Sequence, residues 1–224
     1  VKKREIMAKI HKKRSETGYP YIFFTDNVND NKPQWYKDKG MEIKHSQLCA
    51  EIMEYTDEDK SFVCCLSSMN LLHYDEWKSS NAVRVLTNLL EAVYTEFVEK
   101  ASGVPFLEKA VRFAEDHRSI GVGALGYHSY LQSKRIPFES LTARLLNKEM
   151  FRVIDSETRS ESQALSISQG EPAVLKGYGE RFSTRMAIAP TTSSSFILGQ
   201  VSPSIEPLQS NYFTKDLAKG KFTY

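Results

Sequence analysis

The chain has 224 residues, of which 41% are hydrophobic, and a formal net charge of +2. This length is sufficient for a sizeable core in one domain. The nearly balanced charge gives no general indication of nucleic-acid binding, and no segment approaches the ~18 consecutive apolar residues of a membrane span. Three cysteines, an odd number, and a charged amino end without a following apolar stretch favour a reducing, cytoplasmic setting.

The first part of the chain is expected to contain a helix, a strand and a loop. Residues 2–16 carry Ile6 and Ile10 four positions apart among many cations, which predicts a solvated amphipathic helix rather than a nucleic-acid arm. The apolar run Tyr21–Thr25 predicts a buried strand. The polar, turn-rich residues 26–40 predict a loop.

The remainder is expected to be mainly helical. An apolar, strand-like run opens residues 61–70, and a short strand is predicted over residues 185–189. Helical spacing predicts helices over residues 75–100, 104–116, 127–133 and 138–169, the last with Leu141, Leu145, Met150 and Ile154 facing inward.

The stretch Gly121–Gly126 matches the dinucleotide-loop pattern G-x-G-x-x-G. A charged helix end precedes it where a dinucleotide fold needs a strand. We therefore expect these glycines to permit close packing of backbone at the turn into the next helix.

Three polar side chains alternate within the segment of residues 44–52. In an extended segment, residues two apart point the same way, so Gln47, Cys49 and Glu51 would share one face. An amide, a thiol and a base on one ridge suit chemistry in which sulfur takes a hydrogen from a substrate while a carboxylate moves a proton.

The other two cysteines are adjacent, at Cys64 and Cys65. Free cysteines are usually buried and inert, and we assign Cys65, which has apolar neighbours, to packing. A bond between the two would be strained, because adjacent Cα atoms lie closer than disulfides normally allow. No fourth soft ligand suggests zinc, and no Gly-x-Ser-x-Gly turn suggests a hydrolase. A redox role for Cys64 remains.

A hydroxyl-rich loop, Pro190–Ser195, lies between the predicted strand and an apolar stretch. Strand-to-helix turns expose backbone N–H groups that bind anions, and short hydroxyls add donors. On these residues alone, one hydroxyl capping a helix while the others are solvated is the better interpretation.

Five segments in order resemble the large subunit of ribonucleotide reductase, class I. They are Thr17–Phe24, His45–Ile52, Val63–Leu71, Arg118–Gly123 and Ala189–Ser195, followed by Ile205-Glu206-Pro207. The second resembles the family's finger-loop motif Ser-Asn-Leu-Cys-x-Glu-Ile, except that Gln47 stands where the family normally has Asn.

The resemblance implies an α/β fold: part of a ten-stranded α/β barrel with several long helices. Residues 1–224 would form only a fragment of this catalytic barrel domain, with its central finger loop at about 44–52 and a phosphate loop at about 189–195. Nothing resembles the family's nucleotide-binding cone, its radical-path tyrosines or its other redox cysteine. We therefore expect a piece of a split, processed or truncated subunit that begins at Val1 and ends at Lys221–Tyr224 inside the domain.

The resemblance also implies roles for individual residues. Cys49 would carry a thiyl radical, Glu51 would take the ribose 3′-hydroxyl proton, Gln47 would hold the ribose hydroxyls, and Cys64 would form a redox pair with a cysteine outside this sequence. The implied substrate-binding residues are Ser46, Leu66, Pro190, Thr191, Thr192, Ser193 and Ser194, the last four holding the diphosphate. Cys49 and Cys64 would approach each other across a pocket lined by Glu51 and this loop.

The implied partners are a ribonucleoside diphosphate, complementary large-subunit chains and a radical-generating small subunit with a metal-containing cofactor. Thioredoxin or glutaredoxin would be the reductant, and no cofactor or metal would bind this chain itself. No nucleic acid or membrane is expected as a partner, and the isolated fragment would be inactive. Two alternatives remain: a non-catalytic assembly piece, suggested by Gln47, and a stand-alone thiol protein using Cys49 and Cys64.

Overall fold

The computed structural model describes residues 2–217 and 220–223. The chain divides into two compact units, Val1–Thr56 and Asp57–Tyr224, which we call unit 1 and unit 2. The end of the chain at Tyr224, and its start at Val1, lie outside the described residues. No helix of the described part has the length and apolar character needed to cross a membrane.

The described residues of unit 1 form three helices: α1 (Lys3–Thr17), α2 (Thr25–Asn31) and α3 (Gln34–Asp38). The predicted amphipathic helix is confirmed as α1, which buries no residue and ends at Gly18 in a left-handed conformation. A small buried set follows α2, consisting of Tyr36, Met41, Ile43 and Ile52. Tyr36 donates a hydrogen bond to the buried Glu54 carboxylate, with 2.8 Å between Oη and Oε2.

Two predictions for unit 1 are wrong. The run Tyr21–Thr25 is not a buried strand: Tyr21 and Phe24 are 51% and 64% exposed, and α2 begins at Thr25. An apolar run becomes a buried strand only where a neighbouring strand pairs with it, and no strand of the described residues does so here. The predicted loop over residues 26–40 instead contains α2 and α3.

Unit 2 is built around two parallel strands, β1 (Cys65–Asn70) and β2 (Ile120–Leu125), paired from Cys65↔Ile120 to Asn70↔Leu125. Parallel neighbours require a crossover. Here it consists of η1 (Leu71–His73), α4 (Tyr74–Trp77), α5 (Ala82–Ala101) and α6 (Glu108–His117). After β2 come α7 (Tyr127–Ser133), α8 (Leu141–Gln169), η2 (Ala173–Leu175), α9 (Thr192–Ile197) and the antiparallel pair β3 (Thr214–Leu217) and β4 (Gly220–Thr223).

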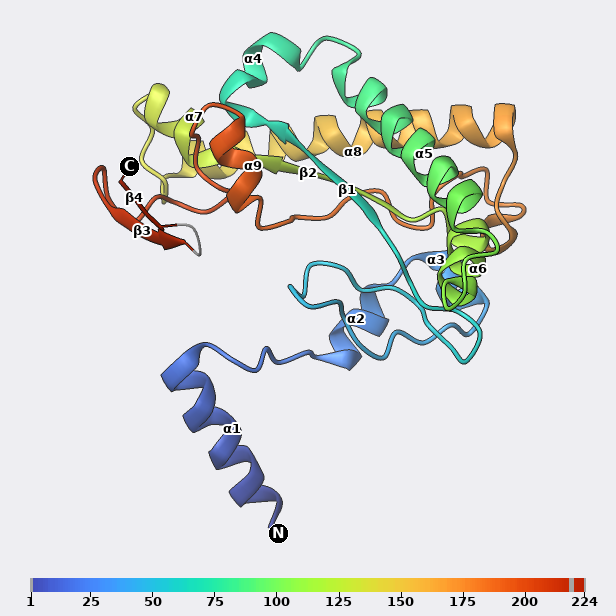
Figure 1. The fold of residues 1–224 in the computed structure, drawn as a ribbon. Helices are drawn as coiled ribbons and strands as arrows, with labels where there is room; N and C mark the ends of the chain where they lie inside the picture. Colours follow the sequence, from blue (N-terminus) through green and yellow to red (C-terminus); the bar gives the residue numbers. More distant parts are fainter. Residues whose placement is uncertain (1, 218–219, 224) are drawn as a thin grey trace. The chain divides into compact units, whose positions relative to one another are not determined.

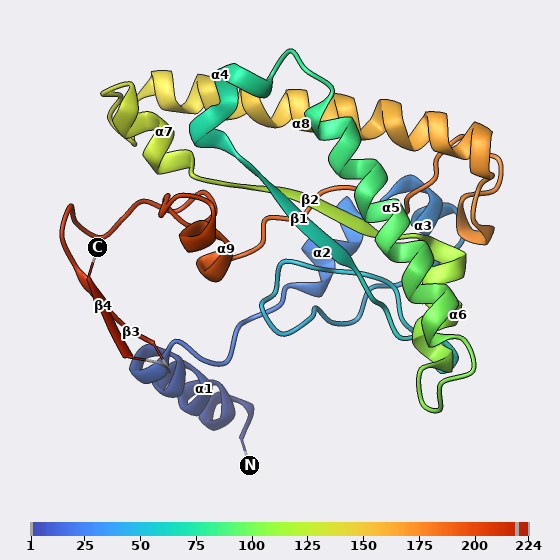
Figure 2. The same ribbon diagram turned by 45° about the horizontal axis from the view of Figure 1, so that its top comes forward.

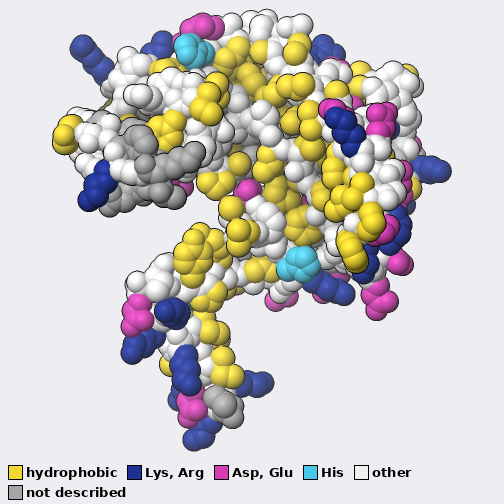
Figure 3. All heavy atoms as spheres, in the orientation of Figure 1, with side chains coloured by type: hydrophobic (Ala, Val, Ile, Leu, Met, Phe, Trp, Pro, Cys, Tyr) yellow, Lys and Arg dark blue, Asp and Glu magenta, His cyan; other side chains and the backbone are white. Residues whose placement is uncertain are grey.

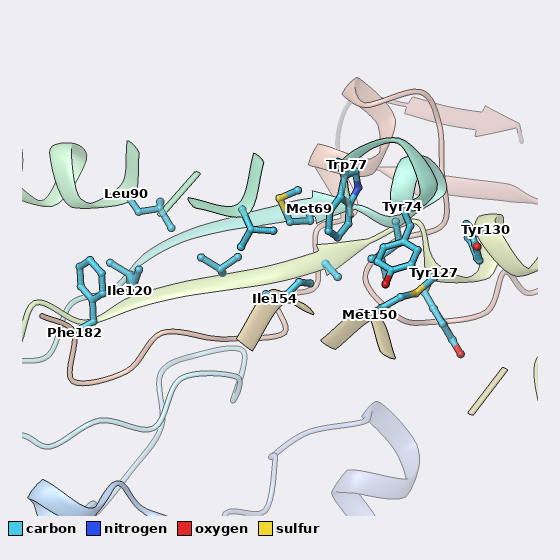
Figure 4. Close-up of a cluster of buried hydrophobic side chains, with 14 of the residues drawn as sticks. Met69, Tyr74, Trp77, Leu90, Ile120, Tyr127, Tyr130, Met150, Ile154 and Phe182 are labelled. Carbon is cyan, nitrogen blue, oxygen red and sulfur yellow. The ribbon is translucent and has the colours of Figure 1, made fainter. Parts of the chain in front are cut away.

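Within unit 2, α5 and α8 pack on each other, and α5 also contacts both strands (Figures 1 and 2). The buried cluster between these elements is shown in Figure 4 and is rich in aromatic side chains. Its largest members include Tyr74, Trp77, Tyr94, Met150, Ile154 and Phe182. The predicted α/β fold class is confirmed.

The predicted helices are found with shifted bounds. The helix expected over residues 75–100 is interrupted between Trp77 and Ala82, and α6 begins four residues later than predicted. The bounds predicted for α7 are confirmed. The long helix begins at Leu141 because Ser140 caps it: its Oγ accepts from the Ala143 N–H at 3.1 Å.

Two of the four α8 residues that were predicted to face inward are exposed instead. Met150 and Ile154 are fully buried, but Leu141 and Leu145 are 70% and 60% exposed. Five residues separate Leu145 from Met150, so the two side chains point about 140° apart on a helix. The buried stripe instead starts at Ala143 and continues to Met150 in helical steps.

A segment after η2 runs along the second edge of β2. Val122 and Met186 form a parallel bridge, and the N–H of Val122 donates to the Arg185 carbonyl at 2.9 Å. The predicted strand over residues 185–189 is therefore reduced to a single bridge.

The glycines of β2 explain how this segment can approach so closely. A Cβ at Gly121 would lie 2.8 Å from the Ala187 Cβ, and one at Gly123 only 2.2 Å from the Ala187 carbonyl oxygen. The expected close backbone packing is confirmed, although these residues form a strand and not a turn.

One face of α5 exposes apolar side chains. Val85, Leu89 and Val93, four residues apart, are 56%, 56% and 43% exposed, and hydrophobic side chains gather over this region in Figure 3. Within the described residues, β1 pairs along one edge only.

Candidate functional site

The segment of residues 44–52 forms a closed loop in unit 1. The Gln47 N–H donates to the Ile52 carbonyl at 3.2 Å, and the Ala50 N–H donates to the Gln47 carbonyl at 3.1 Å. The Gln47 side chain closes the loop further, since its Oε1 accepts from the Ile52 N–H at 3.0 Å. The expectation of a uniformly extended ridge is wrong, because the chain turns over Leu48–Ala50.

Cys49 lies at the tip of this loop and is exposed. Ala50, the next residue, has φ 62°, in the left-handed region that non-glycine residues rarely adopt. Glu51 is partly buried, and its Oε2 is shielded from solvent without a hydrogen-bond partner. A buried carboxylate oxygen with no donor is costly unless a ligand supplies one, so Glu51 has an acceptor oxygen that a ligand could satisfy.

Two tyrosines that sequence reasoning did not single out lie near the loop. The rings of Tyr19 and Tyr21 are 5.1 Å apart. A hydrogen bond with Tyr19 raises the pKa of Tyr21, and the nearby Cys49 thiol acts in the same direction. Both tyrosines are exposed.

The paired cysteines of unit 2 differ in environment. Cys65 begins β1 and packs against the buried cluster, and burial, followed by the Glu91 charge, raises the pKa of its thiol. Cys64 precedes the strand, is partly buried, and its Sγ lies 3.8 Å from the Cys65 carbonyl oxygen. These differences support the assignment of Cys65 to packing and leave Cys64 as the redox candidate.

A cavity of about 290 Å³ lies between β1, the end of β2 and the hydroxyl-rich loop. Of the predicted substrate-binding residues, Leu66, Thr191 and Ser194 line it. Ser67 and Ser68 of β1 also line it, and sequence reasoning missed both. The only signal for them was their place in the Ser-rich continuation of the Cys64 segment.

The other predicted loop residues do not line this cavity. Thr192 lines a separate cavity of about 260 Å³ that also contains Phe196 and Pro207. Pro190 and Ser193 are exposed. The Thr191 hydroxyl accepts from the Ser204 N–H at 2.7 Å, so it already fastens the loop to the following segment.

Asn70 fastens α9 to the strand pair, a role that sequence reasoning also missed. Its Nδ2 donates to the Leu198 carbonyl at 3.1 Å, and its Oδ1 accepts from the Leu72 N–H at 3.1 Å. A Cβ at Gly126 would lie 2.7 Å from this Oδ1. The cavity wall therefore depends on an amide at the end of β1.

The predicted site residues fall into two groups. Ser46, Gln47, Cys49 and Glu51 are brought together in the loop of unit 1, and the Ser46 hydroxyl donates to the Gln47 carbonyl at 3.1 Å. Cys64, Leu66 and the residues of the hydroxyl-rich loop belong to unit 2. The approach of Cys49 to Cys64 across a pocket stays a prediction. In the described part of the chain, no three His, Cys, Asp or Glu side chains are grouped to hold a metal ion.

Comparison with known proteins identifies the class to which this parallel α/β framework and thiol-bearing loop belong. The family model described as "Ribonucleotide reductase, barrel domain" matches residues 1–174 and 172–224. The chain belongs to this family, and the resemblance found in its five segments is confirmed.

Curated relatives are ribonucleoside-diphosphate reductase large subunits. That of Invertebrate iridescent virus 3 is 41% identical over 223 residues, covering 99% of this chain and 35% of the relative. The putative large subunit of Frog virus 3 is 42% identical over 208 residues, covering 92% of this chain and 37% of the relative.

A solved structure agrees with these relatives. The class Id ribonucleotide reductase alpha subunit of Actinobacillus ureae is 53% identical, with a TM-score of 0.91, and the match covers 93% of this chain and 40% of that one. The chain thus spans little more than a third of the length of the proteins it matches.

Proposed function

We propose that this chain forms the central part of the catalytic subunit of a ribonucleoside-diphosphate reductase, which converts ribonucleotides to 2′-deoxyribonucleotides for DNA synthesis. The observation that carries the proposal is the closed loop with Cys49 at its exposed tip and an unpartnered, shielded oxygen on Glu51 two residues later. Family membership gives this arrangement its reaction class.

Cys49 starts the reaction as a thiyl radical. Its sulfur takes the hydrogen atom from C3′ of the ribose, which leaves a carbon radical and restores the thiol. Glu51 takes the proton of the 3′-hydroxyl, a task suited to a carboxylate oxygen that has no other donor. A metal-containing radical cofactor on a small subunit would supply the initial oxidation of Cys49.

Cys64 and a cysteine outside this sequence supply the two electrons of the reduction. The 2′-hydroxyl leaves as water after protonation, and the two thiols supply that proton and the new hydrogen at C2′ as they become a disulfide. Cys49 then returns its hydrogen atom to C3′, which regenerates the thiyl radical. Exchange with thioredoxin or glutaredoxin then restores the dithiol. Such exchange requires a reducing compartment, in keeping with a cytoplasmic location.

The substrate diphosphate would lie at the loop of residues 190–194. Hydroxyls of Thr191 and Ser194, with Ser67 and Ser68 opposite, line the cavity of about 290 Å³ there. Leu66, also on its wall, would contact the ribose or base. Thr192, Ser193 and Pro190 would complete the loop from outside this cavity, and Ser46 would support the ribose side from unit 1.

Activity would require complementary large-subunit chain or sequence. The unpaired edge of β1 and the apolar face of α5 formed by Val85, Leu89 and Val93 are surfaces that a complete barrel and its surroundings would cover. By itself the 224-residue chain would be inactive.

The test is reconstitution. The chain is co-expressed with the remaining large-subunit sequence and a radical-generating small subunit, and cytidine diphosphate reduction is measured with a dithiol reductant. Cys49→Ser should abolish turnover, because an oxygen-centred radical is far harder to generate than a thiyl radical. Cys65→Ala should retain substantial turnover, and Cys64→Ala should not. Turnover by Cys49→Ser, or a dead Cys65→Ala with an active Cys64→Ala, would contradict the assigned roles.

A second candidate is a non-catalytic assembly piece of the same family. Gln47, in place of the usual Asn, favours it. A reconstituted complex that assembles stoichiometrically with the wild-type chain but shows no reduction, while the Gln47→Asn complex is active, would establish this alternative.

A further inference from the structure

We infer that Gln47 is a positioning residue whose side-chain oxygen braces the finger loop and thereby sets where Cys49 and Glu51 stand. The inference deepens the proposed function and depends on it for the catalytic consequence. The brace itself is a property of this chain alone and can be measured without turnover.

The brace consists of the hydrogen bond from the Ile52 N–H to Gln47 Oε1, at 3.0 Å. A backbone hydrogen bond between the same two residues runs beside it, from the Gln47 N–H to the Ile52 carbonyl at 3.2 Å. Ile52 is only 5% exposed, so packing around its side chain holds this residue in place. Gln47 therefore ties one side of the loop to a fixed residue on the other side.

The tip of the loop has little else to hold it. Leu48 is 88% exposed, Cys49 is exposed, and Ala50 has φ 62°. Strained backbone of this kind persists only where neighbouring interactions over-determine it. The hydrogen bonds between Gln47 and Ile52, and from the Ala50 N–H to the Gln47 carbonyl, span the loop at this tip.

The length of the glutamine side chain matters for this contact. Asparagine is shorter by one carbon–carbon bond, about 1.5 Å. Its amide oxygen would fall outside hydrogen-bonding distance of the Ile52 N–H unless the backbone moved. Glutamine at this position is thus matched to a loop of this width.

The hydrogen bond to Ile52 also determines which hydrogen-bonding group of the Gln47 side chain remains for a substrate. A carboxamide has one acceptor end and one donor end. With Oε1 committed to Ile52, only Nε2 remains, so Gln47 would meet a ribose hydroxyl as a donor. The hydroxyl it contacts must accept that hydrogen bond and is left free to give its own proton elsewhere.

Amide hydrogen exchange in the full ¹⁵N-labelled chain tests the brace. Gln47→Met keeps the shape and removes the oxygen, so the Ile52 amide should exchange roughly 3- to 10-fold faster, as expected for loss of one hydrogen bond. Gln47→Asn should behave similarly. Gln47→Glu, which keeps an acceptor oxygen at the same length, should preserve protection. Leu48→Ala, at the exposed tip, is the matched control and should change nothing.

Two exchange results would overturn the inference. One is an Ile52 amide that exchanges at the wild-type rate in Gln47→Met. The other is equal acceleration in Gln47→Met and Gln47→Glu, which would mean that the acceptor oxygen is not what protects Ile52.

Kinetics in the reconstituted enzyme separate positioning from simple binding. Gln47→Asn should lower kcat by tenfold or more with little change in KM, because Cys49 is displaced relative to a substrate that still binds. A rise in KM alone would contradict positioning. If exchange follows the expected pattern but no complex reduces nucleotides, the brace stands and the proposed function fails.

Discussion

Arg181 and Glu91 form a buried ion pair, with 2.7 Å between Arg181 Nη2 and Glu91 Oε1. The same guanidinium donates through Nη1 to the Gly170 carbonyl at 2.9 Å, just after α8 ends. Arg118 Nη1 approaches the same Glu91 oxygen at 3.4 Å. One carboxylate on α5 therefore holds two arginines that come from the end of α6 and from the segment after α8.

Arg181→Met should lower the free energy of unfolding by about 3–5 kcal/mol, because it leaves Glu91 buried with part of its charge uncompensated. Urea unfolding of the full chain measures this change. Arg84→Met is the matched control, since Arg84 also joins α5 to α8, through Glu161, but is 46% exposed. Its effect should stay below about 1 kcal/mol. Equal effects of the two variants would contradict a special role for burial.

The three thiols should react at different rates with iodoacetamide near neutral pH. Cys49 is exposed, whereas burial raises the pKa of Cys65. Only the thiolate reacts, so Cys65 should be alkylated slowest and its rate should rise only at higher pH. Peptide mass spectrometry at several pH values resolves the three sites. Labelling of Cys65 as fast as that of Cys49 at pH 7 would show that β1 does not bury it.

Gly123→Ala should destabilise the chain by about 1–3 kcal/mol, the usual cost of overpacking. The added Cβ would meet a backbone oxygen, that of Ala187, at 2.2 Å. Gly121→Ala is the comparison: its closest contact, at 2.3 Å, is the tip of the flexible Leu66 side chain, and its closest rigid contact, the Ala187 Cβ at 2.8 Å, is less severe than the 2.2 Å contact at Gly123. Denaturant midpoints should therefore rank wild type above Gly121→Ala and Gly121→Ala above Gly123→Ala. A reversed order of the two variants would contradict the close approach of the Ala187 carbonyl.

His117 should make the chain less stable as the pH falls below about 6.5. Burial, reinforced by the Lys60 charge, lowers the pKa of His117 to about 3, while the Asp116 and Asp57 charges oppose the shift. Between these two pH values the unfolded chain binds a proton that the folded chain does not, so stability must rise with pH. From pH 7 to pH 5 the loss attributable to His117 is about 2 kcal/mol.

The control for this prediction compares how steeply the free energy of unfolding changes with pH in the wild type and in a His117 variant. His117→Asn lowers stability at every pH, but its stability should fall less steeply than that of the wild type between pH 7 and pH 5. Parallel curves would mean that His117 is protonated in the folded chain as readily as in the unfolded one.

Local patterns predicted those parts of the fold in which neighbouring residues decide the structure. The α7 bounds followed from Gly126 before the helix and helical spacing after it. The start of α8 was predicted three residues too early, because the cap at Ser140 was not recognised from the sequence. The run Tyr21–Thr25 could not be predicted in this way, because an apolar run is a strand only when another strand pairs with it.

The candidate site shows the same division. The motif around Cys49 could be recognised from the sequence, because residue types at fixed spacing identify the family. The hydrogen bond from the Ile52 N–H to Gln47 Oε1 could not be predicted, since it depends on the loop turning back on itself. The place of Ser67 and Ser68 in the cavity wall likewise could not be predicted, because it depends on the pairing of β1 with β2 and on the hydroxyl-rich loop lying beside β1.

The register of β1 against β2 has a consequence for the cysteine doublet. Cys65 pairs with Ile120 and faces the core, which leaves Cys64 as the sulfur outside the strand. A slip of one residue would reverse the facing of every side chain along the strand, and the two sulfurs would exchange places. The space that Gly123 leaves for the Ala187 carbonyl exists in one alignment of the backbone. Correct strand pairing during folding thus determines which of the two neighbouring thiols is packed against the core and which one lies outside the strand.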